Sequence, residues 1–507
     1  MKLSELLYEG EYRSHYSPEA IEITRIVSDT RALEPRCLFV CLKGTRFDTH
    51  TLMERIDEAG AAAILAEQDA LIPESLRVPV FLVKSTRRAL ALAFSRFYGC
   101  PEKQLTMIGI TGTNGKTSTA TILASLLTSA GYPTGLIGTA ECVYNGKVYT
   151  LPQEKDGDTR LRTMTTPDPD VLYPILRRMA DEGVTHVVME VSSHSLALEK
   201  VAPIHYRVGI FTNISPEHMD FHGSMDRYLE AKASLFCQCD VGICNADNEY
   251  AAALIARSTC RIRTAGVAFA ADVRATDIRL LGTKGIAYCY TTPGMRLRVR
   301  TSLPGSFSVY NSLLALTAAI ELSVPPLTAT EALVRPIAIP GRLERVELGK
   351  DYGFSVFIDY AHTEAALRSL LTTVRSFCTE GERIVLLFGC GGDRDKSKRA
   401  PMGRAAEELA DRVIVTSDNS RTEDPQAIID DILSGMRDKS RVTVIKSRRR
   451  AITRAILEAE PGDILLLCGK GHETYEIGPL GVRHFDEREI VADALEKRKN
   501  GDTENEN

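Results

Sequence analysis

The chain has 507 residues, which exceeds one ordinary domain and suits three of typical size. Hydrophobic residues make up 44% and charged residues 25%, a balance that excludes a disordered or fibrous protein. The formal net charge of −5 argues against general binding to nucleic acid or to an anionic membrane. No apolar run reaches the roughly 18 residues of a membrane span, and Arg13 and several acids occupy the place of a signal-peptide core. We therefore expect a cytoplasmic, monomeric enzyme without membrane insertion.

The twelve cysteines are scattered along the chain, many inside apolar runs such as those at Cys41, Cys390 and Cys468. Cys237 and Cys239 are separated by one residue, and no second pair of cysteines follows at zinc-finger spacing. The pattern favours free, buried thiols in a reducing compartment over a structural zinc site.

Residues 1–102 are predicted to form a small α/β domain. Strand-like runs at 37–42, 61–67 and 78–83 alternate with a helix-like segment at 52–60.

A second domain is predicted over residues 103–340. The apolar run at 105–110 is followed by a glycine turn and by a helical pattern that ends at Gly131, and further apolar runs lie at 184–191, 207–213 and 241–246. Short runs of this kind are typical of strands buried on both faces, so we expect a parallel sheet wrapped by helices.

A third domain is predicted over residues 341–507. Strand-like runs at 383–390, 411–417, 442–446 and 463–468 alternate with helix-like segments at 401–410, 425–436 and 447–460. This alternation predicts a Rossmann-like, doubly wound sheet whose ligands bind at the carboxyl ends of its strands. The fold class is therefore α/β in three domains.

The strongest local motif is TGTNGKTS at Thr111–Ser118, between a predicted strand and a predicted helix. Its glycines let consecutive amides face one anion, Lys116 can reach terminal phosphates, and the Thr117 hydroxyl can bind Mg²⁺. The usual spacing would place glycine at Ile110, so this is a variant phosphate loop. A glycine turn that only caps a helix is the alternative, which the strand–loop–helix context disfavours. The predicted ATP-binding residues are Gly112, Thr113, Asn114, Gly115, Lys116, Thr117 and Ser118.

Other motifs accompany this loop. They are TTP at Thr165–Pro167, MEVSSHSL at Met189–Leu196, the segment Phe211–Phe236, PGRLERV, DYAHT at Asp359–Thr363, FGCGGDRDKSKR and GKGHETY. Together with the loop they resemble the Mur ligase family over nearly the whole chain. The first block, SDTRALEPRCLFVCLKGTRFDTH, is similar to the UDP-binding domain of the member that adds the third peptide residue to a cell-wall precursor.

The resemblance implies an ATP-dependent ligase that forms an acyl phosphate and lets an amine attack it. Glu190 and His218, which taken alone fit a solvated strand end and a loop histidine, match the family's Mg²⁺ ligands, with Thr117 on the nucleotide's metal. Lys232, which alone fits a solvated helix face, matches a lysine that is carbamylated and holds a second Mg²⁺. The implied catalytic residues are Lys116, His218 and Lys232, and the implied cofactors are ATP and Mg²⁺.

The resemblance also implies a UDP-N-acetylmuramoyl dipeptide as substrate. Thr30, Gly44, Thr45 and Arg46 match its uridine end, although Thr45 alone would be an ordinary turn residue. Thr165, Thr166 and Ser192 match its muramoyl peptide. Leu198 and Lys200 replace the family's common Gln and Arg, and lysine keeps the charge without the two-pronged geometry. Asn311 matches an adenine-side contact, and Asp359 and His362 match residues near the nucleotide.

The incoming amino acid is implied by the third domain. Family members that use meso-diaminopimelate carry Asp-Asn-Pro-Arg, and this chain has Asp418, Asn419, Ser420 and Arg421. An arginine can hold a distal carboxylate through two hydrogen bonds, which lysine as a substrate does not offer. Arg394 matches a second arginine of that pocket, and Gly469 and Glu473 match the contacts to the amino and carboxyl groups.

Three alternatives stay open from the sequence. The same ligase with L-lysine or ornithine is the first, and a folylpolyglutamate synthetase is the second, although it needs neither the UDP-binding block nor the Asp418–Arg421 motif. A nucleotide-binding regulator without catalysis is the third, and the presence of Lys116, Glu190, His218 and Lys232 disfavours it.

Overall fold

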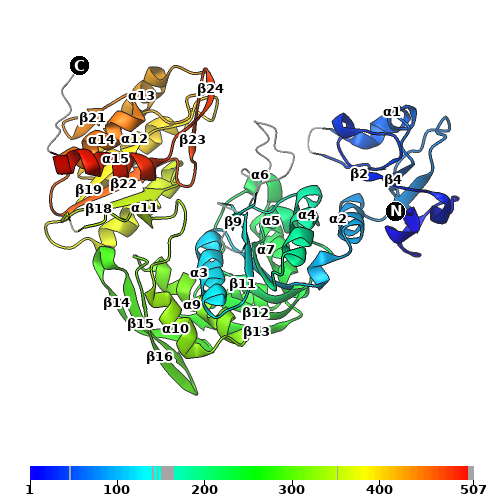
Figure 1. Cartoon of the computed structure of the whole chain (residues 1–507), viewed down its shortest axis with the longest axis horizontal. Helices are drawn as coiled ribbons and strands as arrows, with labels where there is room; N and C mark the ends of the chain where they lie inside the picture. The colour runs from blue at the N-terminus through cyan, green and yellow to red at the C-terminus, as the bar shows by residue number, and fades with distance from the viewer. Residues whose placement is uncertain (45–46, 140–141, 145–146, 150–164, 351, 501–507) are drawn as a thin grey trace. The chain divides into compact units, whose positions relative to one another are not determined.

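The computed structural model describes residues 1–44, 47–139, 142–144, 147–149, 165–350 and 352–500. The chain divides into two compact units, Met1–Arg274 with Leu313–Ala329, and Ala275–Ser312 with Thr330–Asn507. Figure 1 shows their helices and strands. In the described part of the chain no helix is long and apolar enough to cross a membrane, and every one of the twelve cysteines is a free thiol.

The first unit begins with a five-stranded sheet of order β1-β5-β4-β3-β2. Its strands pair in parallel except for the edge strand β1. The elements are β1 (Tyr12–Arg13), β2 (Arg25–Val27), β3 (Cys37–Val40), α1 (Met53–Glu58), β4 (Ala63–Glu67), β5 (Val80–Val83) and α2 (Thr86–Phe97). Strand β3 is buried along its whole length, which explains its unbroken apolar sequence.

The same unit continues with the large sheet, in which β13-β12-β11-β6-β10-β7 are neighbours and parallel and β8 and β9 follow antiparallel. Helix α3 packs against β6, β7 and β10, and α8 packs against β12. The strands are β6 (Thr106–Thr111), β7 (Thr134–Ile137), β8 (Cys142–Tyr144), β9 (Lys147–Val148), β10 (His186–Glu190), β11 (Tyr206–Phe211), β12 (Cys239–Asn245) and β13 (Arg261–Gly266). The helices are α3 (Lys116–Ser129), α4 (Pro169–Asp181), α5 (Ser193–Ala197), α6 (Met219–His222), α7 (Met225–Ala233) and α8 (Ala251–Ile255).

Three elements cross the division between the units: β14 (Val273–Leu280), α9 (Phe307–Glu321) and α10 (Pro326–Val334). The second unit then contains the antiparallel hairpin of β15 (Ile286–Thr292) and β16 (Met295–Thr301).

The second unit is built on a six-stranded sheet of order β17-β18-β22-β19-β20-β21, parallel except for β17. Its elements are β17 (Glu344–Arg345), β18 (Ser355–Asp359), α11 (Glu364–Phe377), β19 (Arg383–Phe388), α12 (Arg399–Leu409), β20 (Arg412–Val415), α13 (Pro425–Leu433), β21 (Val442–Val444), α14 (Arg448–Glu458), β22 (Asp463–Cys468), β23 (Tyr475–Gly478), β24 (Gly481–His484) and α15 (Glu487–Asn500).

Two separate cores show that this sheet is covered on both faces. Side chains of α11, α12 and α13 form one core with Leu386 and Leu466, and side chains of α14 and α15 form the other with Val385 and Leu465. The chain runs outward from β19 to β21 and returns through α14 to β22, so the strand order reverses between β19 and β22. Ligands of doubly wound sheets bind beside such a reversal, at the carboxyl ends of the strands.

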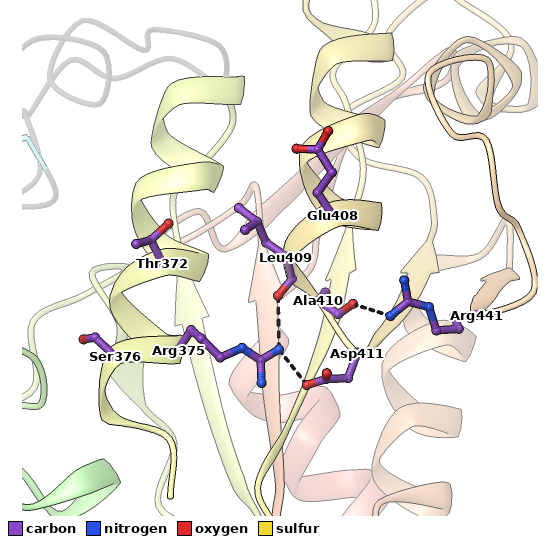
Figure 2. A pocket seen from close by; sticks show the side chains of 8 residues that line it. All are labelled: Thr372, Arg375, Ser376, Glu408, Leu409, Ala410, Asp411 and Arg441. Carbon is purple, nitrogen blue, oxygen red and sulfur yellow. Dashed lines mark hydrogen bonds and ion pairs between the residues drawn. The ribbon is translucent and has the colours of Figure 1, made fainter.

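An open cavity of about 430 Å³ lies beside α11 and the end of α12, and hydrogen bonds and an ion pair connect the residues that line it (Figure 2). Arg375 donates to the Leu409 carbonyl at 3.2 Å and to Asp411 Oδ2 at 2.8 Å, and Arg441 donates to the Ala410 carbonyl at 3.4 Å. These bonds satisfy carbonyls that a helix end leaves without partners. We interpret this cavity as part of the structural contact between α11 and α12 and not as a binding site.

The predicted fold class is confirmed, with a small α/β domain, a central parallel sheet and a doubly wound C-terminal sheet all present. The domain boundaries at 102 and 340 stay predictions.

Candidate active site

The phosphate loop joins β6 to α3, as predicted. Gly112 has φ +154° and Gly115 has φ +82°, and a Cβ on Gly112 would lie 1.9 Å from Thr212 Oγ1. Neighbouring residues fix the loop, because the Thr113 and Asn114 amides donate to the carbonyl and side-chain oxygens of Asn213, each at 2.9 Å. The first four amides of α3 have no partner inside the helix, as at any helix start, and these include Lys116, Thr117 and Ser118. An anion at this point would meet the positive end of the helix.

Lys116 lies over the loop that it follows. Its Nζ donates to the carbonyls of Gly112 at 2.8 Å and Thr113 at 2.9 Å. The ammonium group is therefore at the loop and within reach of an anion that the loop binds.

Glu190 ends β10, next to β6 in the sheet, and is only 1% exposed. Thr139 holds its carboxylate, since its amide donates to Oε1 at 2.9 Å and its hydroxyl donates to Oε2 at 3.1 Å. Gly138 makes room for this arrangement, because a Cβ there would lie 2.3 Å from Glu190 Oε1. Glu190 is thus a buried, oriented carboxylate and not the solvated strand end that the residue alone suggests.

Three of the predicted peptide-binding residues gather beside Glu190. Thr139 Oγ1 lies 3.0 Å from Thr165 Oγ1, and Thr166 Oγ1 donates to the Glu190 carbonyl at 2.9 Å. The Ser192 amide donates to Thr166 Oγ1 at 3.0 Å, and the Ser192 side chain caps α5. Thr139 was missed from the sequence, although it follows β7 at the same carboxyl edge of the sheet.

Lys200, the fourth predicted residue of this group, forms an ion pair with Asp168 at 2.6 Å and is largely buried. The structure therefore gives this lysine a partner within the chain.

His218 has φ +56° and lies in a cluster of aromatic rings. Its ring lies edge-on to the rings of His194, at 4.8 Å between centroids, and Tyr228, at 6.5 Å. His222 packs on Tyr228 at 4.7 Å, and its Nε2 lies 3.0 Å from Ser193 Oγ. Sequence reasoning missed His194, His222 and Tyr228, although His194 belongs to the SSHSL motif and His222 lies one helical turn after His218.

Lys232 is buried on α7, with 1% of its surface exposed. Its Nζ lies 4.4 Å from the centroid of the Tyr228 ring, and the described residues give it no hydrogen bond or ion pair. Burial, and secondarily the positive charge of Lys116, lowers its pKa well below the ordinary value, against the opposing effect of Glu217. The structure thus contains an amine that is favoured in its neutral, nucleophilic form.

No cluster of three or more His, Cys, Asp or Glu side chains able to hold a metal ion occurs in the described ranges. Glu190 and His218 therefore do not form a preassembled protein cage. The hydroxyl of Thr117 and the carboxylate of Glu190 are nevertheless the oxygen donors that Mg²⁺ prefers, and Mg²⁺ usually takes its other ligands from water and substrate phosphates. The residues fit such an ion.

The predicted uridine-side residues lie in the first sheet. Thr30 begins a short 3₁₀ helix after β2, and Gly44 follows β3, the parallel neighbour of β2. Both thus follow the carboxyl ends of paired strands. Thr45 and Arg46 lie outside the described residues.

The predicted amino-acid residues converge at the carboxyl ends of β20 and β22 in the second unit. Asn419 Nδ2 donates to Glu473 Oε2 at 2.7 Å, and Asn419 Oδ1 accepts from Lys470 Nζ at 2.9 Å. Gly469 has φ +112°, and a Cβ there would lie 2.7 Å from Asp418 Oδ2. Lys470, which the sequence analysis did not name, is fully buried between Asp418 and Glu473, at 4.0 and 3.6 Å.

The two carboxyl groups beside Lys470 differ in pKa. Burial raises the pKa of Glu473, whereas the pKa of Asp418 lies below its usual value because Lys470 and Arg448 outweigh its burial. Asp418 is thus the fixed negative charge of this pair, and Glu473 is the group that can take a proton.

The two predicted arginines differ in their hydrogen bonds and in their exposure. Arg421 has φ +52°, and its Nη1 donates to the carbonyls of Gly392 at 2.8 Å and Asn419 at 3.3 Å. Arg394 is exposed, and its guanidinium has no hydrogen-bond or ion-pair partner in the described part of the chain. Both flank Gly391, where a Cβ would lie 3.0 Å from Arg421 Nη1 and 3.8 Å from Arg394 Cγ. Arg394 is therefore the free cation at this edge.

The remaining predicted residues also lie in the second unit. Asp359 ends β18 and accepts from the amides of Leu343 at 2.7 Å and Ala361 at 2.8 Å, and burial raises its pKa. His362 is exposed, with Nδ1 2.9 Å from the Tyr360 carbonyl. Asn311 is buried on α9, and its role in binding adenine stays a prediction.

The phosphate loop and the doubly wound C-terminal sheet define a nucleotide-dependent enzyme of the multidomain α/β class. A family model described as the Mur ligase middle domain matches residues 110–319, and one described as the Mur ligase, glutamate ligase domain matches residues 341–471. The chain belongs to the Mur ligase family and is an ATP-dependent peptide ligase.

The relatives carry more specific names. A protein of Clostridium perfringens (strain 13 / Type A) named UDP-N-acetylmuramoyl-L-alanyl-D-glutamate–2,6-diaminopimelate ligase is 38% identical over 502 residues, which cover 98% of this chain and 100% of that protein. A solved structure of a ligase with the same name has a TM-score of 0.71 at 27% identity and covers 98% and 99% of the two chains. Folylpolyglutamate synthase of Mycobacterium tuberculosis, with a TM-score of 0.59 at 19% identity over 82% of this chain and 96% of its own, shares the fold alone.

Proposed function

We propose that this chain joins meso-2,6-diaminopimelate to UDP-N-acetylmuramoyl-L-alanyl-D-glutamate at the expense of ATP, a step in peptidoglycan precursor synthesis. The choice of amino acid rests on the charged side chains around Asn419. There the fixed carboxylate of Asp418 can face an ammonium group, and the free guanidinium of Arg394 can face a carboxylate. Diaminopimelate carries both groups at its distal end. The names of the relatives support the same assignment.

The reaction has two balanced steps. An oxygen of the dipeptide carboxylate attacks the γ-phosphorus of ATP, which releases ADP and forms an acyl phosphate. The amine of the amino acid then attacks the acyl carbon, releasing inorganic phosphate and a proton and forming the amide. Lys116 and the amino end of α3 bind the phosphates and stabilise the charge that builds on them.

Magnesium would be held by Thr117, Glu190 and His218, together with Lys232 as a carbamate. Bound there, it would neutralise the repulsion between two anionic reactants. Thr139 keeps the Glu190 carboxylate turned in one direction before any ion arrives.

Carbamylation of Lys232 is part of the proposal. The amine is buried, has no ion-pair partner among the described residues and lies over the Tyr228 ring. A reaction with CO₂ forms an N–C bond, releases a proton and converts the side chain to an anion.

The dipeptide substrate would place its uridine end at Thr30, Gly44, Thr45 and Arg46. Its peptide would lie at Thr165, Thr166 and Ser192, which already form one hydrogen-bonded group with Glu190 and Thr139. Lys200, paired with Asp168, would orient the peptide through that pair.

The test is an assay of ATP-dependent phosphate release with the UDP-muramoyl dipeptide and a panel of amino acids. We expect turnover with meso-diaminopimelate to exceed that with L-lysine or ornithine by at least about tenfold, since a lost charge-assisted contact costs about 1.5–3 kcal/mol. A preference for L-lysine or ornithine would refute the amino-acid assignment. Turnover with a folate in place of the dipeptide would refute the substrate class.

A further inference from the structure

A cationic cavity of the second unit lies next to the amino-acid site. It has a volume of about 540 Å³ and lies between the amino end of α14 and the hairpin of β23 and β24. Five cationic side chains and one carboxylate line it. It shares Ser420 and Arg448 with the residues named above at the amino-acid site.

Two of the five cations are neutralised within the fold. Arg448 is fully buried and forms an ion pair with Glu487 at 2.7 Å, and its Nη2 donates to the Cys468 carbonyl at 2.8 Å. Arg483 forms an ion pair with Glu476. We therefore assign these two arginines a structural role in the lining of the cavity.

The other three cations are weakly compensated. Lys446 lies 3.3 Å from Asp424 with both side chains more than half exposed, and Arg449 lies 3.7 Å from Asp493. The Arg450 guanidinium has no ion-pair or hydrogen-bond partner in the described ranges. Exposed pairs of this kind contribute little, so Lys446, Arg449 and Arg450 keep an excess of positive charge at the mouth of the cavity.

The helix α14 adds to this charge. Its eleven residues begin at Arg448, directly after the capping residue Ser447, so the positive end of its dipole faces the same space.

A largely buried serine whose hydroxyl has no partner among the described residues is a separate observation in favour of a polar ligand. Ser420 lines the cavity and is 6% exposed, and no described residue forms a hydrogen bond with its Oγ. The neighbouring side chains Asp418 and Asn419 contact Lys470 and Glu473 instead. The Asp418–Arg421 loop therefore presents Ser420 to this cavity while its other residues belong to the amino-acid site. The Ser420 hydroxyl is therefore open to this cavity and can donate a hydrogen bond to a ligand there.

We propose that this cavity is a second anion site, which binds the diphosphate group of a small molecule. The phosphate oxygens would be held by the side chains of Lys446, Arg449 and Arg450 and by the amides of Arg448 and Arg449, because the Arg450 amide already donates to Ser447 Oγ. Ser420 would donate its hydroxyl. The exposed apolar side chains of Leu480 and Val482 on the hairpin would cover the uncharged part of the ligand. This site is independent of the proposed ligase reaction.

The chain contains no tryptophan, so Leu480→Trp at the exposed rim provides a local fluorescence probe. We titrate this variant with inorganic pyrophosphate, without metal and at constant ionic strength. We expect a saturable change in emission that Lys116→Ala leaves unaltered. Arg449→Ser with Arg450→Ser should raise the half-saturating concentration at least about tenfold, by the loss of two charge-assisted contacts.

The matched control is Arg437→Ser with Lys439→Ser, which removes two exposed cations that do not line the cavity. A midpoint shift as large in this control as in the arginine variant would overturn the proposal, as would the absence of a saturable change or its loss on Lys116→Ala. Lys446→Ser provides a second, single substitution, for which we expect a smaller increase in the same midpoint. ADP and UDP are compared with pyrophosphate: tighter binding of either identifies a nucleotide as the ligand, and equal binding identifies the diphosphate group alone.

Discussion

The hydroxyl of Tyr228 lies 3.0 Å from Oγ1 of Thr113, so α7 is hydrogen-bonded to the phosphate loop. The ring of the same tyrosine lies against Lys232. The predicted phosphate loop and the helix that carries the buried lysine are therefore connected through one side chain.

Replacement of this tyrosine tests the connection. Tyr228→Phe removes the hydroxyl but keeps the ring, so we expect a KM for ATP about fivefold higher, which corresponds to about 1 kcal/mol for one hydrogen bond. Initial rates at varied ATP give the value. Tyr144→Phe, which removes a hydroxyl that donates to Glu182 in the same unit, serves as control. Equal KM values for the two variants would contradict the connection.

Lys232→Ala tests the carbamate. We expect kcat to fall at least about tenfold, because the carbamate would itself be a metal ligand and even the loss of an outer-shell partner costs about 10- to 100-fold. We expect it to recover in part when a short carboxylate is added, because it can replace the missing anion. Lys103→Ala, an exposed lysine in the same unit, should behave as wild type. Full activity of Lys232→Ala, or no response to the carboxylate, would remove this role.

Arg394→Ala tests recognition of the amino acid. We expect its KM for diaminopimelate to rise roughly 10- to 100-fold through the loss of charge-assisted hydrogen bonds, with little change in the KM for ATP. Arg394→Lys should recover only part of the loss, because lysine lacks the two-pronged geometry. Arg404→Ala, an exposed arginine on α12, is the control. An unchanged KM in Arg394→Ala would exclude this arginine from the site.

The lowered pKa of His222 predicts that the free energy of unfolding depends on pH. Burial is the main cause that lowers its pKa from 6.5 to about 4, helped by the neighbouring His194 and opposed by Asp220. Between these values the unfolded chain binds the proton and the folded chain does not, so the stability present above pH 6.5 is lost as the pH falls toward 4.

Urea unfolding of wild type and His222→Gln at pH 7 and pH 5 measures this effect. We expect the free energy of unfolding of the wild type to fall more between the two pH values than that of the variant. An equal fall in both proteins would show that His222 does not titrate as described.

The sequence by itself determined the strand–helix alternation of the C-terminal sheet, several strands of the other two sheets and the phosphate loop, but not the hairpins of β15–β16 and β23–β24. The predicted elements and the loop are local features, since apolar runs of four to six residues and glycines around Lys116 act through their neighbours in the chain. Glu190 and Ser192, predicted to bind metal and peptide, lie at the carboxyl end of β10, where the topology of a parallel sheet brings such residues to one edge, whereas Lys232 lies on α7.

Only the tertiary structure decided the environment of each side chain. Thr139 holds Glu190 across 51 residues of chain, and Lys470 reaches Asn419 across the same number, so neither contact has a local sequence signal. The burial of Lys232 and His222, which sets their pKa values, depends on helices packing around them. Charge and proton affinity are set by distance and solvent exposure, and these exist only once the chain has folded.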